Sequence, residues 1–266
     1  MDNNSHIMEY TPRFRDFLEI TKKCEQTYLG YGNPNAQILI VANEPGTTDN
    51  NLIEHDLNQN LQKWNDNLPG KAMDSVEDML YGDYPHWEQF NPLWPFKGQH
   101  FTIGDKYRHT SRSWLQCQKL VDMIYSECHE CNRQKEDSLD FFKRAFITDF
   151  SSVCGKRSND ISPDERLASI IKRLPMFASD YISHFPVIIV ASGHYIRDIE
   201  PLHDLRKVFH GFDKIEFIND AFGWRNIHYS EDGKRILIHT KHFASAISDN
   251  YLRKIALACT SFLSDN

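Results

Sequence analysis

Polar side chains that can do acid–base and hydrogen-bond chemistry stand directly after, or at the end of, three separate apolar runs of the sequence. They are an amide, two carboxylates and two imidazoles, at Asn43, Glu44, Asp149, His239 and His242. Amide and carboxylate oxygens can hold a water molecule or the polar edge of a substrate. A histidine can donate or accept a proton near neutral pH. Turns that only connect elements do not need this combination, so we expect a functional site.

The elements that must position these side chains are short strands. Residues 37–42, 145–150 and 187–191 are nearly continuous apolar runs of strand length, and residues 235–239 form a further one. Runs that are apolar on both faces are typical of parallel strands in the middle of a sheet. Because functional sites of such sheets form beyond the carboxyl ends of the strands, the polar residues should meet at one edge.

Helical patterns separate the strands and predict a three-layer α/β protein. Thr11 is a candidate N-cap with Pro12 at the first helical position, and Ser162 and Glu165 form a capping box. Further helices are expected at 52–64, 111–124 and 251–263, a strand at 214–218, and a hairpin between 226–229 and 235–239. We predict a four-stranded, mostly parallel sheet flanked by helices, in one domain over residues 1–266. A large insertion follows the first strand, at about 50–140.

Composition and charge narrow the class of protein. The chain has 266 residues, 40% of them hydrophobic and 25% charged, which excludes a disordered or fibrous protein. Its net charge of −7 argues against a protein that coats nucleic acid, although it leaves room for a local basic groove. No secretory signal and no membrane-length apolar run is visible, and six cysteines are scattered along the chain. We expect a cytoplasmic monomer that does not bind a membrane.

The motifs of nucleotide cofactors and of common hydrolases are missing. The sequence has neither a phosphate-binding loop of the G-x-x-x-x-G-K-[ST] type nor a G-x-G-x-x-G turn, so no nucleotide cofactor is expected. It has no nucleophilic serine elbow. Cys128 and Cys131 form a lone C-x-x-C pair whose relation to the other cysteines does not match a metal-binding pattern, so we expect no metal.

Four segments resemble the uracil-DNA glycosylase superfamily. Residues 32–46, GNPNAQILIVANEPG, look like its opening motif, in which a Gly-x-Pro-x-Ala segment precedes the first strand and a Pro-Gly turn follows it. Residues 145–149 resemble the second strand, and 187–194 the third. Residues 236–244, ILIHTKHFA, resemble the last strand and its His-Pro-Ser motif, with Phe243 and Ala244 in place of Pro and Ser.

The resemblance implies hydrolysis of the N-glycosidic bond between a base and deoxyribose, with the nucleotide flipped into a pocket. Asn43 or Glu44 would then hold the attacking water, and both stay open for this role. His242 would donate to the base carbonyl as negative charge develops there, while His239 is the alternative imidazole. Each of these residues also has a purely structural interpretation, as a helix cap or as a histidine bonded to a carbonyl.

Asp149 departs from the asparagine that the resemblance leads us to expect. Asparagine can both donate to and accept from uracil, whereas an ionised aspartate only accepts. Cytosine offers an amino donor, and a protonated aspartate, favoured by burial, could donate to its N3. Asp149 therefore favours cytosine or a modified cytosine over uracil. The alternative is an aspartate that merely caps the strand end.

The remaining candidates concern contacts with DNA. Phe96, in Trp-Pro-Phe-Lys-Gly, resembles a family segment whose phenylalanine stacks on the base. Lys156, Arg157 and Lys241 flank predicted strand ends and could meet phosphates, and Phe243 could enter the base stack as a wedge. Solvated surface or core packing is the alternative for each.

The sequence thus predicts a DNA glycosylase that acts without a cofactor on a flipped-out pyrimidine, either modified cytosine or uracil, and leaves an abasic site. Its setting would be DNA repair or defence against phage with modified DNA. Two alternatives remain open: a non-catalytic nucleic-acid-binding module on the same fold, and a hydrolase of small nucleosides.

Overall fold

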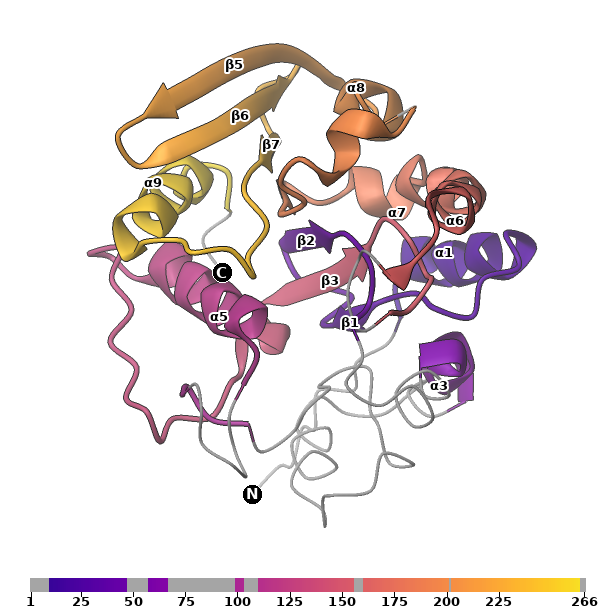
Figure 1. Cartoon of the computed structure of the whole chain (residues 1–266), viewed down its shortest axis with the longest axis horizontal. Helices are drawn as coiled ribbons and strands as arrows, with labels where there is room; N and C mark the ends of the chain where they lie inside the picture. The colour runs from indigo at the N-terminus through magenta and orange to yellow at the C-terminus, as the bar shows by residue number, and fades with distance from the viewer. Residues whose placement is uncertain are drawn as a thin grey trace.

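The computed structural model describes residues 10–46, 57–66, 99–102, 110–155, 160–200 and 202–263. The described part is an α/β protein in which helices lie on both sides of a central sheet (Figure 1). The strands are β1 (Tyr31–Gly32), β2 (Ile38–Ala42), β3 (Ala145–Asp149), β4 (Val187–Val190), β5 (Phe212–Asp220), β6 (Gly223–Ser230) and β7 (Ile236–His239). The helices are α1 (Pro12–Lys23), α3 (Asn60–Asp66), α5 (Arg112–Tyr125), α6 (Pro163–Phe177), α7 (Asp180–Ser183), α8 (Leu205–Val208) and α9 (Asp249–Thr260), with 3-10 turns η2 (Phe141–Lys143) and η4 (Tyr195–Asp198).

The sheet is mixed and larger than the sequence predicted. Its strand order is β1-β3-β2-β4-β7-β6-β5. Four neighbouring strands, β3, β2, β4 and β7, run parallel to one another, while β1, β6 and β5 are antiparallel to their neighbours. The predicted four-stranded sheet is therefore wrong in size. The predicted hairpin and the strand at 214–218 join the same sheet because β6 pairs with all four residues of β7 on one side and with β5 on the other.

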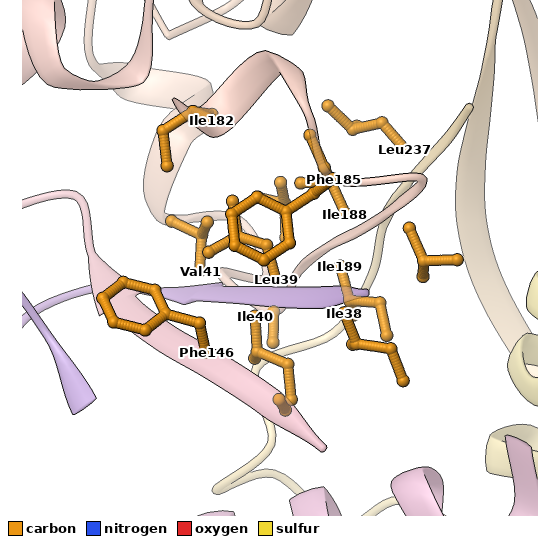
Figure 2. Packing of buried hydrophobic residues seen from close by; sticks show 14 of the residues in the cluster. Ile38, Leu39, Ile40, Val41, Phe146, Ile182, Phe185, Ile188, Ile189 and Leu237 are labelled. Atoms are coloured by element: carbon orange, nitrogen blue, oxygen red, sulfur yellow. The ribbon is translucent and has the colours of Figure 1, made fainter. Parts of the chain in front are cut away.

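Two groups of helices cover the sheet. α5 packs against α9, and α1 packs against α6 and α7, with β2 and β3 between the two groups (Figure 1). Successive side chains of β2 point to opposite faces, so Leu39 and Val41 lie on the side of Ile182 in α7 while Ile38 and Ile40 lie on the other (Figure 2). All four are buried, which explains the continuous apolar run.

Local signals place several helix starts where the sequence predicted them. The Thr11 side chain accepts a hydrogen bond from the backbone N–H of Phe14, and Pro12 is the first residue of α1. Ser162 and Glu165 form the reciprocal hydrogen bonds of a capping box, which begins α6. These bonds satisfy N–H groups that have no partner within the helix. No described helix is long and apolar enough to cross a membrane.

Candidate functional site

Register alone brings the predicted site residues to one edge of the sheet. Asp149 lies opposite Ala42, Val41 opposite Val190, and Val190 opposite His239. The residues that follow these positions therefore emerge together beyond the carboxyl ends of β2, β4 and β7. The site predicted from three separate strand ends is one place in the structure.

The turn after β2 holds two buried oxygens without a partner. The backbone N–H of Ser151 donates to the carbonyl of Asn43 at 2.9 Å, which fixes the chain just past the strand. Asn43 is 9% exposed, and neither its Oδ1 nor the Oε2 of Glu44 has a hydrogen-bond partner among the described residues. Because buried polar atoms are usually paired, this pair indicates a place for a water molecule or a polar ligand.

Two side chains from other elements surround Glu44. The Nε of Arg166, in α6, is 3.9 Å from Oε2 of Glu44, so the pair interacts through charge at longer than hydrogen-bond distance. The Arg166 guanidinium carbon lies 5.0 Å from the centre of the Tyr195 ring. Burial, and then the Glu44 carboxylate, raises the pKa of Tyr195, so this phenol stays protonated. Arg166 and Tyr195 thus limit the orientations open to the Glu44 carboxylate.

Asp149 is buried and bonded on one side only. The Tyr28 hydroxyl donates to Oδ2 of Asp149 at 2.5 Å, and the described residues give Oδ1 no hydrogen bond. Burial raises the pKa of Asp149 to about 7; the Tyr28 bond and the Arg173 charge oppose this rise, and Glu44 adds to it. A proton on Asp149 would therefore sit on Oδ1, since Oδ2 accepts from Tyr28.

A fully buried arginine supports this arrangement. Arg173 of α6 donates to the carbonyls of Asp149 at 3.1 Å and of Tyr28 at 2.6 Å, and to Oγ1 of Thr148 at 2.9 Å. Its guanidinium also lies 5.2 Å from the centre of the Tyr28 ring. One cation thus ties the end of β3 to the segment that carries Tyr28.

His242 lies in the loop after β7, within the field of Glu44. Burial lowers its pKa and the Glu44 charge opposes that effect, so the ring is neutral near pH 7. The backbone N–H of Ala244 donates to Nδ1 of His242 at 3.3 Å, which leaves the proton of a neutral ring on Nε2. Gly193 allows this approach: it has a positive φ of 59°, and a Cβ added there would lie 3.2 Å from the backbone nitrogen of His242.

His239, the alternative imidazole, is bonded to the backbone. Its Nε2 lies 2.8 Å from the carbonyl oxygen of Gly193, to which it donates. Burial lowers the pKa of His239 to about 4, and its ring meets the Trp224 ring edge-on at 4.9 Å. These contacts match the structural interpretation of this histidine and favour His242 as the residue that faces a ligand.

The other predicted contacts fall into two groups. Lys241 lies over the Tyr251 ring at 5.1 Å, and Phe243 is 2% exposed in the core, so this conformation does not present Phe243 as a wedge. The predicted contacts of Phe96, Lys156 and Arg157 lie outside the described residues. No group of three or more metal-binding side chains occurs in the part of the chain that the structure describes, and Cys131 donates to Asp122.

Sequence reasoning missed Tyr28, Arg173, Tyr195 and Arg166. Arg173 had a signal: it lies among Ser169, Ile170, Met176 and Phe177 on the buried face of α6, where a charged residue calls for a partner. The others had none, because their roles arise from contacts between segments far apart in the chain.

Comparisons with protein families and with curated proteins found no relative from which a function could be inferred. No protein-family model matches the chain, and a search of curated proteins found no match. What stands is an α/β protein with a mixed seven-stranded sheet and a polar, partly unsatisfied site at the carboxyl edge of its parallel strands.

Proposed function

We propose that the protein is a DNA glycosylase that hydrolyses the N-glycosidic bond of a flipped-out pyrimidine, modified cytosine or uracil, and leaves an abasic site. One observation carries the proposal: buried oxygens of Asn43 and Glu44 that accept no hydrogen bond from the described residues share one strand edge with Asp149 and a neutral His242. The proposal also draws on the resemblance of residues 32–46 and 236–244 to motifs of the uracil-DNA glycosylase superfamily. Repair, or defence against phage with modified DNA, is the proposed setting.

The turn after β2 would supply the water. Within the described part of the chain, Asn43 Oδ1 and Glu44 Oε2 each lack a hydrogen-bond donor, and an attacking water needs acceptors for its hydrogens. As the bond between C1′ and the base nitrogen breaks, its electron pair leaves with the base and the sugar becomes oxocarbenium-like. The water oxygen then bonds to C1′ and its proton passes to the Glu44 carboxylate.

His242 would stabilise the departing base. Its neutral tautomer, with Nδ1 accepting from Ala244, aims an N–H donor away from the backbone. A donor placed where negative charge develops lowers the barrier, and removal of one such donor costs about 10²–10³ in rate. The carbonyl oxygen next to the cleaved bond is the expected acceptor.

Asp149 would select the base. Because Tyr28 occupies Oδ2, the remaining Oδ1 is the atom that reads the substrate edge. A protonated Oδ1 donates to N3 of cytosine, whereas N3 of uracil carries its own hydrogen and meets this donor unfavourably. The proposed substrate is therefore modified cytosine first and uracil second.

The test uses labelled oligonucleotides, single- and double-stranded, carrying uracil, cytosine, hydroxymethylcytosine or its glucosylated form, followed by alkali to break abasic sites. We expect cleavage at a modified cytosine, and a loss of about 10²-fold or more in Asn43→Ala or Glu44→Ala and in His242→Ala. Asn35→Ala, an exposed amide before β2, is the matched control and should retain activity.

Two outcomes would contradict the proposal. No cleavage of any oligonucleotide at high enzyme excess would leave a non-catalytic binding module as the better interpretation. Release of base from free nucleosides, without action on oligonucleotides, would favour a nucleoside hydrolase. Cleavage of uracil alone would keep the glycosylase but refute the role given to Asp149.

A further inference from the structure

One face of the outer sheet carries a row of rings that starts at the candidate site. Asn226 lies opposite both His239 of β7 and Phe217 of β5, and Trp224 lies two residues before it on β6. Paired residues share a face, and so do residues two apart along a strand. His239, Trp224 and Phe217 therefore lie on one face, across three neighbouring strands. With His194 they form what we call the aromatic row.

The inner part of the aromatic row is stacked and its outer part is open. The rings of His194 and Trp224 are stacked at 5.1 Å with 30° between their planes, and Trp224 meets His239 edge-on at 4.9 Å. Phe217 is 75% exposed, the highest value among the exposed large hydrophobic side chains of the described residues. Figure 1 shows β5 and β6 as a long ribbon along one side of the molecule. The exposed Phe217 ring and the stacked His194–Trp224 pair thus offer flat faces on the same side of the outer sheet.

The face of the aromatic row is free of acidic side chains at its paired strand positions. Alternation places Glu216 and Asp220 of β5 on the opposite face, where Glu216 accepts from the Tyr229 hydroxyl at 3.1 Å. The polar neighbours of the row are instead the amides Asn219 and Asn226. The acidic side chains Asp204 and Asp213 lie near Arg206 of α8, toward the end of this face that carries His228, so the immediate neighbours of the aromatic row are uncharged.

We infer that the aromatic row is a stacking platform for unpaired bases of a single DNA strand that leads away from the candidate site. Aromatic rings in series bind successive bases with little regard to sequence, since every base has a flat face. His239 holds the inner end of the row against Gly193, which also contacts the His242 loop, so a strand stacked on Trp224 and Phe217 would lead away from the proposed pocket. The inference rests on the proposed function for the identity of its ligand and extends that function beyond the pocket.

The test measures binding, not cleavage, with the full chain and a fluorescently labelled 12-nucleotide oligothymidine that carries no target base. Stacking on one ring contributes enough that Phe217→Ala and Trp224→Ala should each weaken the dissociation constant about tenfold. Phe222→Ala is the matched control. Phe222 is 39% exposed in the β5–β6 turn, but its ring lies beneath the Lys254 side chain of α9 and does not belong to the aromatic row. Its affinity should stay within about twofold of the unchanged protein.

Equal affinities for all three variants and the unchanged protein would overturn the inference. So would a dimer, seen by sedimentation, that Phe217→Ala dissociates, because the aromatic row would then bind a second copy of the chain. The oligonucleotide has no base to excise, so this test is independent of cleavage. If the protein cleaves no substrate but the two variants bind more weakly, the platform is supported and only the proposed reaction is refuted.

Discussion

At the scale of single residues, burial sets the protonation of Asp149 and the hydrogen bond from Tyr28 opposes its effect. The pKa of Asp149 is raised from 3.8 to about 7, chiefly by burial. A neutral Asp149 donates from Oδ1, and an ionised one cannot donate at all. Excision of a modified cytosine should therefore fall as the pH rises through about 7, which a pH–rate profile measures.

Tyr28→Phe tests this assignment. The variant removes a donor that lowers the pKa of Asp149, so the fall in activity should move to higher pH. Tyr31→Phe, on the neighbouring ring at 5.5 Å, is the matched control and should leave the profile in place. A profile that does not move in Tyr28→Phe would show that another group controls the reaction.

The same titration predicts how stability depends on pH. Between about pH 4 and 7 the folded protein holds a proton on Asp149 that the unfolded chain has released. Protonation of Asp149 therefore stabilises the folded protein fully below about pH 4. This stabilisation decreases as the pH rises and is lost once the pH has passed through about 7. Relative to Asp149→Asn, the protein should lose on the order of 4 kcal/mol at most across this window. Urea denaturation at pH 5 and pH 8 measures the difference, and equal losses in both proteins would contradict it.

At the scale of elements, α6 connects the site to the core through Arg173. Removing the guanidinium in Arg173→Met leaves buried carbonyls of Asp149 and Tyr28 without a donor. The free energy of unfolding should fall by about 3–5 kcal/mol, because buried acceptors are left without the charged donor that paired with them. Arg253→Met, at a half-buried arginine of α9, should cost less than about 1 kcal/mol. Similar losses in both variants would contradict the role given to Arg173.

Elements were also where prediction from sequence succeeded. The apolar runs of β2 and β4, the Ser162–Glu165 capping box and the hairpin that contains β7 are local patterns, and the structure has each of them. The two-residue strand β1 has no such pattern and was missed, as was the pairing of β5 with β6 that extends the sheet beyond the predicted hairpin. Strand pairing between distant segments depends on tertiary contacts, which periodicity does not encode.

Some residues of the candidate site could likewise be predicted from local sequence patterns, and others could not. Asn43, Glu44, Asp149 and His242 could be predicted because each stands next to a recognisable strand, and the sheet brings strand ends together. Tyr28 follows no strand, and its bond to Asp149 spans 121 residues of sequence. The preference between His242 and His239 needed the hydrogen bond from His239 to Gly193, which only the structure supplies.

At the scale of the whole molecule, the charge of −7 would limit how the proposed DNA substrate is held. If stacking on the aromatic row provides much of the affinity, few phosphate contacts are needed. The logarithm of the binding constant for oligothymidine should then fall with the logarithm of salt concentration with a slope of about −1 to −3, because each phosphate contact to a single strand contributes about −0.7. Anisotropy titrations from low to moderate salt measure it. A much steeper slope would indicate a basic groove.

The pairing of β2 with β3 also has a consequence for how the protein folds. Ile38 and Ala145 are neighbours in the sheet although more than a hundred residues separate them, and β7 joins only after nearly another hundred. Such non-local pairing makes folding slow, because the entropy of closing long loops is lost before any contact is gained. No contiguous fragment holds Asn43, Asp149 and His242 unless it spans this entire stretch. Recovery of activity during refolding would therefore report the last step of sheet assembly, and a nascent chain would remain inactive until its C-terminal strands are made.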